Sequence, residues 1–229
     1  QEIEIVLLPE EKDDELLLKQ KAAQALKIAL NRIQSVQIRK RSIDARSRQV
    51  VFRVKVLVAI DEQLAPEIFT VNYPSVTDKK PVLIVGAGPA GIFAALRCIE
   101  LGLKPIVLER GKDVKQRRRD LAAINKQGLI NPESNYCYGE GGAGTYSDGK
   151  LYTRSNKRGD VNHVLQTLVA YGASPDILVD ARPHIGTNKL PQIITALREQ
   201  ILTAGGEVYF GAKVTDFVLE NSSLKGVVL

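Results

Sequence analysis

The chain has 229 residues, of which 44% are apolar, and it carries a net charge of +6 with a pI near 9.3. This length and apolar fraction exclude a disordered chain and suffice for one large or two modest packed domains. The absence of any run of about 18 apolar residues excludes a transmembrane helix. The first residues are acidic where a secretory signal is basic, so we expect a cytoplasmic protein with no membrane partner.

The first 60 residues have the pattern of a small α+β module. Polar and apolar residues alternate over Glu2–Leu8, Ser35–Ile43 and Gln49–Ile60, which indicates three half-buried strands. Apolar residues at helical spacing lie within 13–31, and Asp14 or the aspartate before it can cap that helix. The order β-α-β-β predicts a sheet that is covered by one helix.

The most informative motif begins with the apolar run Val82–Val85 and continues as Gly86-x-Gly88-x-x-Gly91, a helical pattern and a second apolar run. Gly86 allows a tight turn, Gly88 lets the backbone approach a pyrophosphate, and Gly91 lets the helix pack against the strand. The second run ends on Glu109, 23 positions after Gly86, which is the spacing of an acid that binds an adenosine ribose. The stretch therefore predicts an adenine-dinucleotide site.

The helix after this turn is suited to bind phosphate. Pro89 and Ala90 open it, and a proline there leaves no donor unpaired, while the helix start carries a partial charge of roughly +0.5. Glu109 would repel a 2′-phosphate, which disfavours NADP even though Arg110 is adjacent. The motif alone leaves both NAD and FAD open.

A second glycine-rich stretch, YGEGGAGTYSDGK, runs from Tyr138 to Lys150. Its glycines let the backbone approach a flat or phosphorylated ligand and offer successive N–H groups to an anion. The alternative is a flexible surface loop, but long structureless loops inside compact domains are usually functional. Together with the strands expected within residues 208–229, this loop favours FAD over NAD.

The remaining pattern predicts an α/β fold, namely a Rossmann-like domain with a parallel sheet and a β-meander. The expected elements are a helix from Asn162 to near Gly172, a short strand Asp176–Asp180, a helix from Leu190 to Ala204, and strands Val208–Phe210, Lys213–Glu220 and Gly226–Leu229.

Basic side chains are frequent in the module and after the dinucleotide motif. Those of the module could form a binding face, or the solvated outer face of a half-exposed sheet, which we favour. Those after the motif lie near a diphosphate cofactor, so nucleic acid is not the expected partner. The basic residues of the module are Arg39, Lys40, Arg41, Arg48, Arg53 and Lys55.

Candidate catalytic residues are few. Lys150 could stabilise reduced, anionic flavin, or it could be a surface lysine. His184 could be an acid-base group near a substrate, although a structural histidine is the alternative we favour. Asp148 could orient a neighbour or close a turn. Cys98 and Cys137 form neither a C-x-x-C pair nor a metal-ligand set, so we expect no metal.

Four segments carry a resemblance to a known family. They are VLIVGAGPAGIFAALRCIELGLKPIVLERG, the R-x-x-D spacing of Arg117 and Asp120, NPESNYCYGEGGAGTYSDGKLYTR, and ARPHIGT. Together, over roughly residues 33–229, they resemble uncharacterised bacterial FAD-dependent dehydrogenases of the glutathione-reductase-like flavoprotein superfamily. Disulfide reductases of that superfamily carry a cysteine pair where this chain has only Cys137.

The resemblance implies FAD as cofactor and assigns residues to it. It implies that the glycine turn and the first helical residues hold the pyrophosphate, that Glu109 holds the ribose, and that Arg117, or failing that Arg119, contacts the cofactor. The 141–151 loop would lie beside the flavin, and the backbone of Val214 against the adenine. The implied cofactor-binding set is Gly86, Gly88, Pro89, Ala90, Gly91, Glu109, Arg110, Arg117, Gly142, Ala143, Gly144, Thr145, Asp148, Gly149 and Val214.

The chain thus divides into a module at 1–60, a linker at 61–80 and an FAD-binding domain at 81–229 with part of an inserted segment at about 152–188. The absence of methionine and the end inside an expected strand lead us to expect a piece of a longer protein.

Three functions remain open at this point. The first is an FAD-dependent oxidoreductase that acts on an unidentified small molecule, with NADH or NADPH as a possible electron donor. The second is a flavoprotein that binds or modifies RNA through the basic module, and the third is a non-catalytic nucleotide-binding regulator. We favour the first, and the sequence does not indicate an oligomeric state.

Overall fold

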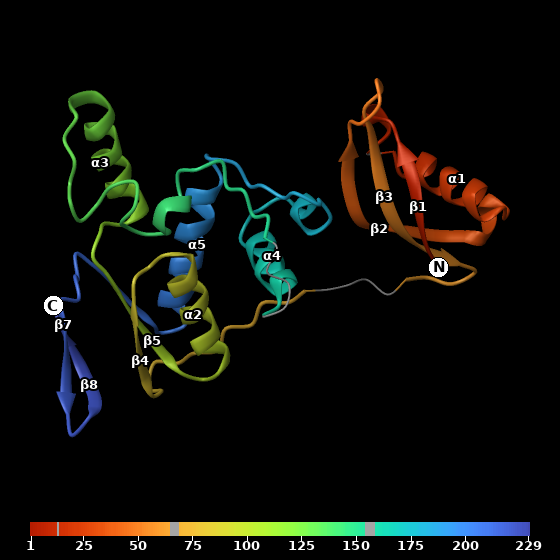
Figure 1. The fold of residues 1–229 in the computed structure, drawn as a ribbon. Coiled ribbons are helices and arrows are strands. Elements are labelled where there is room, and N and C mark those ends of the chain that lie inside the picture. The colour runs from red at the N-terminus through yellow and green to blue at the C-terminus, as the bar shows by residue number, and fades with distance from the viewer. Residues whose placement is uncertain (13, 65–68, 154–158) are drawn as a thin grey trace. The chain divides into compact units, whose positions relative to one another are not determined.

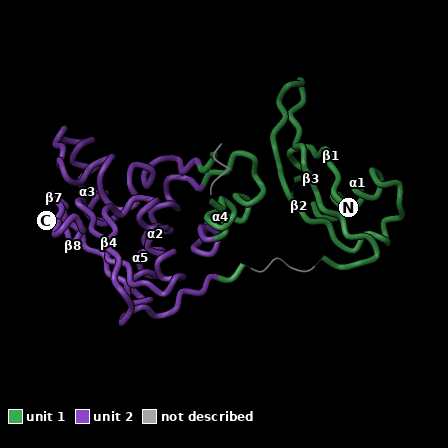
Figure 2. Tube along the Cα trace, turned by 60° about the horizontal axis from the view of Figure 1, so that its bottom comes forward, with its two compact units in different colours: residues 1–70, 151–166, 174–184 green, residues 71–150, 167–173, 185–229 purple. Residues whose placement is uncertain are grey.

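The computed structural model describes residues 1–12, 14–64, 69–153 and 159–229 (Figure 1). Its contacts divide the chain into two compact units (Figure 2). The first unit consists of residues 1–70, 151–166 and 174–184, and the second of residues 71–150, 167–173 and 185–229. In the described part of the chain, no helix is both long and apolar enough to span a bilayer.

The first unit contains the predicted β-α-β-β order of elements. Strands β1 (Glu2–Leu7), β2 (Ile33–Asp44) and β3 (Val51–Ile60) form an antiparallel sheet in the order β1-β3-β2, and helix α1 (Glu15–Leu26) packs against it. The strict alternation of β3 places Val54, Val56 and Val58 in a core with the apolar side of α1. Asp14 caps α1 by accepting a hydrogen bond from the Leu17 N–H at 2.9 Å, whereas Asp13 lies outside the described residues.

Segment 174–184 belongs to the same unit and is attached to the edge strand β2. The predicted strand Asp176–Asp180 is wrong: Ser174 and Pro175 begin a 3-10 helix over Pro175–Leu178, and only a single bridge pairs Asp180 with Arg41. A hydroxyl at the N-cap and a proline in the first turn favour such a turn over an extended chain.

Arg41 is the centre of this attachment and does not belong to a solvated basic face. Its side chain is 8% exposed, and its guanidinium donates to Asp180 at 2.8 Å and to Asp176 at 2.9 Å. The favoured prediction that Arg41 lies on the solvated outer face of the sheet is therefore wrong for this residue, and so is the alternative of a polar binding face. Arg53 is likewise paired, with Asp44 at 2.7 Å and Glu4 at 3.1 Å.

The second unit contains a parallel sheet of β4 (Pro81–Val85), β5 (Lys104–Glu109) and β6 (Glu207–Phe210), in that order. Parallel neighbours require crossover connections, which are supplied by α2 (Pro89–Glu100) after β4 and by a long connection that ends in α5 (Leu190–Thr203). Helices α2 and α5 contact each other and the strands of the sheet (Figure 1). The Rossmann-like α/β fold is thereby confirmed.

The other elements of the chain are α3 (Val114–Gln127), α4 (Val161–Ala170) and the antiparallel hairpin of β7 (Asp216–Glu220) and β8 (Ser223–Val228). The hairpin stands where a β-meander was predicted. Strand β7 begins three residues later than expected, so Val214 lies in a connection without regular secondary structure before the hairpin.

Candidate functional site

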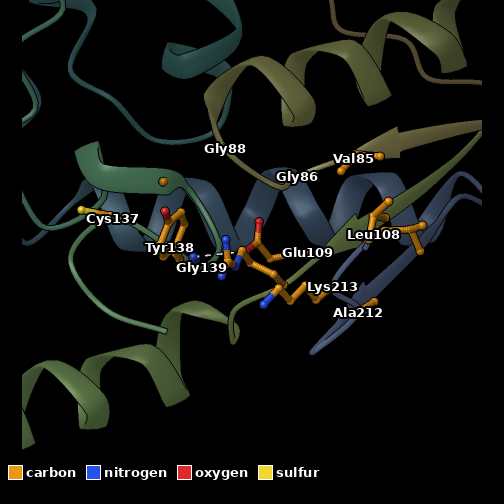
Figure 3. Close-up of a pocket in the computed structure, with 13 residues that line it drawn as sticks. Val85, Gly86, Gly88, Leu108, Glu109, Cys137, Tyr138, Gly139, Ala212 and Lys213 are labelled. Atoms are coloured by element: carbon orange, nitrogen blue, oxygen red, sulfur yellow. Dashed lines mark hydrogen bonds between the residues drawn. The ribbon is translucent and has the colours of Figure 1, made fainter. Parts of the chain in front are cut away.

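A pocket of about 300 Å³ lies at the carboxyl ends of β4 and β5 in the second unit (Figure 3). Ligand sites in open α/β sheets lie at this edge. The volume is at the small end of the range for ligand sites, about 300–1,000 Å³, and so suits one end of a dinucleotide. The pocket is lined by Val85, Gly86, Gly88, Leu108, Glu109, Arg110, Cys137, Tyr138, Gly139, Gly142, Ala212, Lys213 and Val214.

The three motif glycines differ in the space around them. Gly86 has a φ of +97°, which favours glycine, and a Cβ on either Gly86 or Gly88 would meet no atom within 4 Å. A Cβ on Gly91 would lie 1.9 Å from the carbonyl oxygen of Gly86, so only glycine allows α2 to pack so close to the turn. The open space lies where the motif places a pyrophosphate.

The start of α2 faces this open turn without a side-chain cap. Gly88 is the N-cap residue, has no side chain to accept a hydrogen bond, and is followed by Pro89. Uncapped N–H groups and the helix dipole favour an anion at this position. The residues present therefore fit a diphosphate.

Glu109 is buried in the pocket wall, where its carboxylate joins three segments. Oε2 accepts from the Ala87 N–H at 2.7 Å, and Oε1 accepts from the N–H groups of Gly111 at 2.8 Å and Gly139 at 3.1 Å. A carboxylate offers about four acceptor positions, so about one remains for a ribose hydroxyl. Glu109 thus supports the glycine turn in addition to facing the expected ribose.

The second glycine-rich stretch begins by docking on the dinucleotide motif. The Gly141 N–H donates to the Ala87 carbonyl at 2.8 Å, and the Glu140 N–H donates to the Lys112 carbonyl at 3.0 Å. A Cβ on Gly142 would lie 3.2 Å from the Pro89 ring, so this glycine packs directly beside the phosphate turn. The loop therefore forms the wall of the pocket beside the turn.

Arg117 lies inside this loop rather than on the pocket surface. Its side chain is fully buried and donates to main-chain carbonyls of residues 135–140. Burial lowers the pKa of the guanidinium. A direct contact of Arg117 with the cofactor stays a prediction, and Arg119, the second candidate, is exposed on the same helix.

A charged cluster that the sequence analysis did not identify borders the pocket. Glu133 accepts from Arg110 at 2.6 Å and from Lys213 at 2.8 Å, and these bonds lower the pKa of its carboxyl, the Lys213 bond most. The Arg110 guanidinium lies 4.1 Å from the centre of the Tyr138 ring. No local pattern indicates this cluster, because its members come from three separate segments.

Six residues of the implied cofactor set line the pocket, and the other nine do not. The six are Gly86, Gly88, Glu109, Arg110, Gly142 and Val214. Pro89, Ala90 and Gly91 form the first turn of α2, and Gly142, Ala143 and Gly144 form a short 3-10 turn. Thr145 is buried, and its hydroxyl donates to the Glu140 carbonyl at 3.0 Å.

The end of the glycine-rich stretch is held in place by contacts with residues 185 and 186. Main-chain bonds join residues 148 and 149 to Gly186 and Ile185, at 3.0 Å each, and Gly149 is buried against them. Asp148 and Lys150 form an exposed ion pair at 2.9 Å. Their proposed roles at the flavin stay predictions.

Of the remaining candidates, His184 and Cys98 lie outside the pocket lining. His184 is exposed and belongs to the first unit. Cys98 and Cys137 are free thiols, and only Cys137 lines the pocket. Among the described residues, no cluster of histidine, cysteine or carboxylate side chains could hold a metal ion.

Comparisons with known proteins agree with this geometry. The family model of an FAD binding domain matches residues 81–122, and that of a domain of unknown function (DUF8436) matches residues 1–59. An uncharacterized protein of Clostridium beijerinckii is 36% identical over 234 residues, which cover 95% of this chain and 44% of that protein.

Two relatives with names are more distant. Thiamine thiazole synthase of Aeropyrum pernix is 27% identical over 152 residues, or 66% of this chain and 44% of that enzyme. Digeranylgeranylglycerophospholipid reductase of Methanosarcina mazei is 27% identical over 159 residues, or 66% of this chain and 33% of that enzyme. The chain spans less than half the length of these relatives. Its second unit contains a Rossmann-like FAD-binding domain, and its cofactor is FAD.

Proposed function

We propose that the protein is an FAD-dependent oxidoreductase whose flavin exchanges hydride or electrons with an unidentified small molecule. The pocket carries this proposal, because an uncapped helix start and an open glycine turn are closed by a second glycine-rich loop. FAD supplies the electron or hydride transfer when bound, and the protein supplies position and electrostatics. The name of one relative, a reductase, supports redox chemistry.

Three finer statements belong to the same proposal. We place the protein among dehydrogenases of the glutathione-reductase-like superfamily, with NADH or NADPH as electron donor, and in the cytoplasm. A thiol-disulfide mechanism is not part of it, because Cys137 is a single free thiol and Cys98 lies apart from the pocket lining. The proposed FAD site does not include Lys150 or His184, and their roles in catalysis stay predictions.

Substitution of Gly88 tests the cofactor site. Gly88 has an extended backbone, and a Cβ added to it would meet no atom within 4 Å, so the side chain of Gly88→Val begins in the space where the motif places the pyrophosphate. Gly226→Val is the matched control, because Gly226 is equally open but lies in β8, outside the pocket lining. We expect FAD binding, followed by flavin absorbance, to be lost in G88V and kept in G226V.

The reaction class is tested by anaerobic reduction of the FAD-loaded protein. Bleaching of the oxidised flavin band by NADH, NADPH or another donor supports an oxidoreductase. A flavin that stays oxidised with every donor would favour the non-catalytic nucleotide-binding regulator, and a protein that takes up no FAD would contradict the proposal altogether.

A further inference from the structure

The wall of the FAD pocket formed by residues 135–145 is held from inside by one arginine. Arg117 Nε donates to the Asn135 carbonyl at 2.9 Å, and Nη2 donates to the Tyr136 carbonyl at 3.0 Å. Nη1 donates to the Glu140 carbonyl at 2.8 Å and lies 3.4 Å from the Gly139 carbonyl. All three nitrogens of the guanidinium thus bind the main chain of a single loop.

The fit between this side chain and the loop depends on a glycine. A Cβ on Gly139 would lie 2.5 Å from Arg117 Cδ and 3.0 Å from Nε, so the arginine stem fills the space that a side chain would need. Gly139 also has a φ of +117°, which disfavours any other residue. The arginine and the glycine therefore fit each other.

The two sides of the loop main chain are held by different partners. Its carbonyl groups at residues 135, 136 and 140 bind Arg117, whereas its N–H groups at 139, 140 and 141 bind the Glu109 carboxylate and the carbonyls of Lys112 and Ala87. The N–H partners lie in the dinucleotide motif or directly after it. Arg117 therefore supports the loop through its carbonyl groups, whereas the dinucleotide motif and the residues after it bind its N–H groups.

We propose that Arg117 is a positioning residue for FAD, which holds the 135–145 loop in its binding conformation before the cofactor arrives. The inference rests on the FAD site and not on the redox activity. It differs from a direct cofactor contact, because the five oxygens within reach of the guanidinium all belong to the loop and Arg117 does not line the pocket. Its effect on FAD must pass through the loop.

The test compares Arg117→Met and Arg117→Lys with Lys126→Met in the full chain. Lys126 is an exposed residue in the last turn of the same helix and does not line the pocket, so K126M removes one positive charge as R117M does. Two quantities are measured: the Kd for FAD by flavin fluorescence, and amide hydrogen exchange of residues 139–141 in the cofactor-free protein.

We expect the Kd of R117M to rise at least about tenfold, since its loop carbonyls lose a buried charged donor. Exchange at 139–141 should accelerate in the same variant while exchange in residues 1–60 stays unchanged. R117K keeps the charge but not the planar fork of donors, so its values should lie between those of R117M and wild type. K126M should match wild type in both measurements.

Three results would overturn the proposal. A raised Kd with unchanged exchange at 139–141 would mean that Arg117 acts on FAD directly, and a wild-type Kd in R117M would mean that it does not position the site. If R117M does not fold, the cofactor-free wild type still decides, because unprotected amides at 139–141 would show that the loop is not preformed. None of these readouts depends on turnover, so a protein that binds FAD without reducing a substrate would contradict the proposed function alone.

Discussion

Replacement of Glu109 by glutamine preserves the size of the side chain but removes its charge and one of its two acceptor oxygens. In the structure, Oε2 serves the Ala87 N–H, and Oε1 serves the N–H groups of Gly111 and Gly139. A glutamine amide has one oxygen, so it can accept either from Ala87 or from Gly111 and Gly139, but not from both sides. Its NH₂ group then points at N–H donors on the other side and can form no hydrogen bond with them. At least one buried N–H group is left without an acceptor.

The size of the effect follows from this count. Hydrogen bonds to a charged group contribute about 1.5–3 kcal/mol, and a buried donor without a partner costs about 1–3 kcal/mol. We therefore expect Glu109→Gln to lower the free energy of unfolding by about 2–4 kcal/mol. FAD should also bind more weakly, because the glycine turn and the loop lose their common partner.

Urea unfolding followed by far-UV circular dichroism measures the first effect, and titration with FAD measures the second. Glu207→Gln is the matched control on the neighbouring strand β6, where the carboxylate is partly exposed and pairs with Lys104 at 2.6 Å. Such a pair contributes less than about 1 kcal/mol. If E109Q were no less stable than E207Q, the three hydrogen bonds of Glu109 would not hold these segments together.

Further predictions concern the packing of α2 at Gly91, the attachment of residues 174–184 to β2, and the pH dependence of stability. Gly91→Ala should destabilise the protein by about 1–3 kcal/mol, because its Cβ would lie 1.9 Å from the Gly86 oxygen and α2 must move; a normal melting temperature would contradict this. Arg41→Met should cost about 1–2 kcal/mol and speed hydrogen exchange in 176–181, whereas the exposed Lys40→Met should do neither. Burial raises the pKa of the Glu140 carboxyl above its ordinary value of 4.5. The stability that this shift contributes is fully present below pH 4.5, and it is lost as the pH rises through the pKa of the folded protein. The unfolding free energy of wild type relative to Glu140→Gln should therefore fall as the pH rises above 4.5, and a rise would refute the assignment.

The part of the site that could be predicted is the part whose causes are local in sequence. The turn geometry of Gly86, the open space at Gly88 and the close packing at Gly91 follow from a strand, a turn and a helix that are consecutive in the chain. The helix expected from Leu190 to Ala204 is observed over Leu190–Thr203 for the same reason, since its apolar spacing and the glycines after it are local signals.

The parts that could not be predicted depend on partners far away in the sequence. Arg117 is buried while Arg118 and Arg119 are exposed, and only the position of the 135–145 loop distinguishes them. Arg41 differs from its exposed neighbour Lys40 because its carboxylate partners stand more than 130 positions later. Charge and local spacing do not reveal such pairings, so a run of basic residues gives no indication of which one is buried.

The glycine content of the 139–149 loop would by itself indicate flexibility, because glycine loses more conformational entropy on folding than any other residue. The structure opposes that tendency with two buried charges that lie outside the loop. Glu109 accepts one of its N–H groups, and Arg117 donates to its carbonyls and to the Thr145 hydroxyl, at distances of 2.8–3.4 Å. Because Glu109 and Arg117 are charged, their hydrogen bonds to the loop are stronger than hydrogen bonds between neutral groups. The glycines can then leave space for a ligand without leaving the loop disordered, because residues of the dinucleotide motif and of α3 add to the few hydrogen bonds that side chains of the loop make themselves.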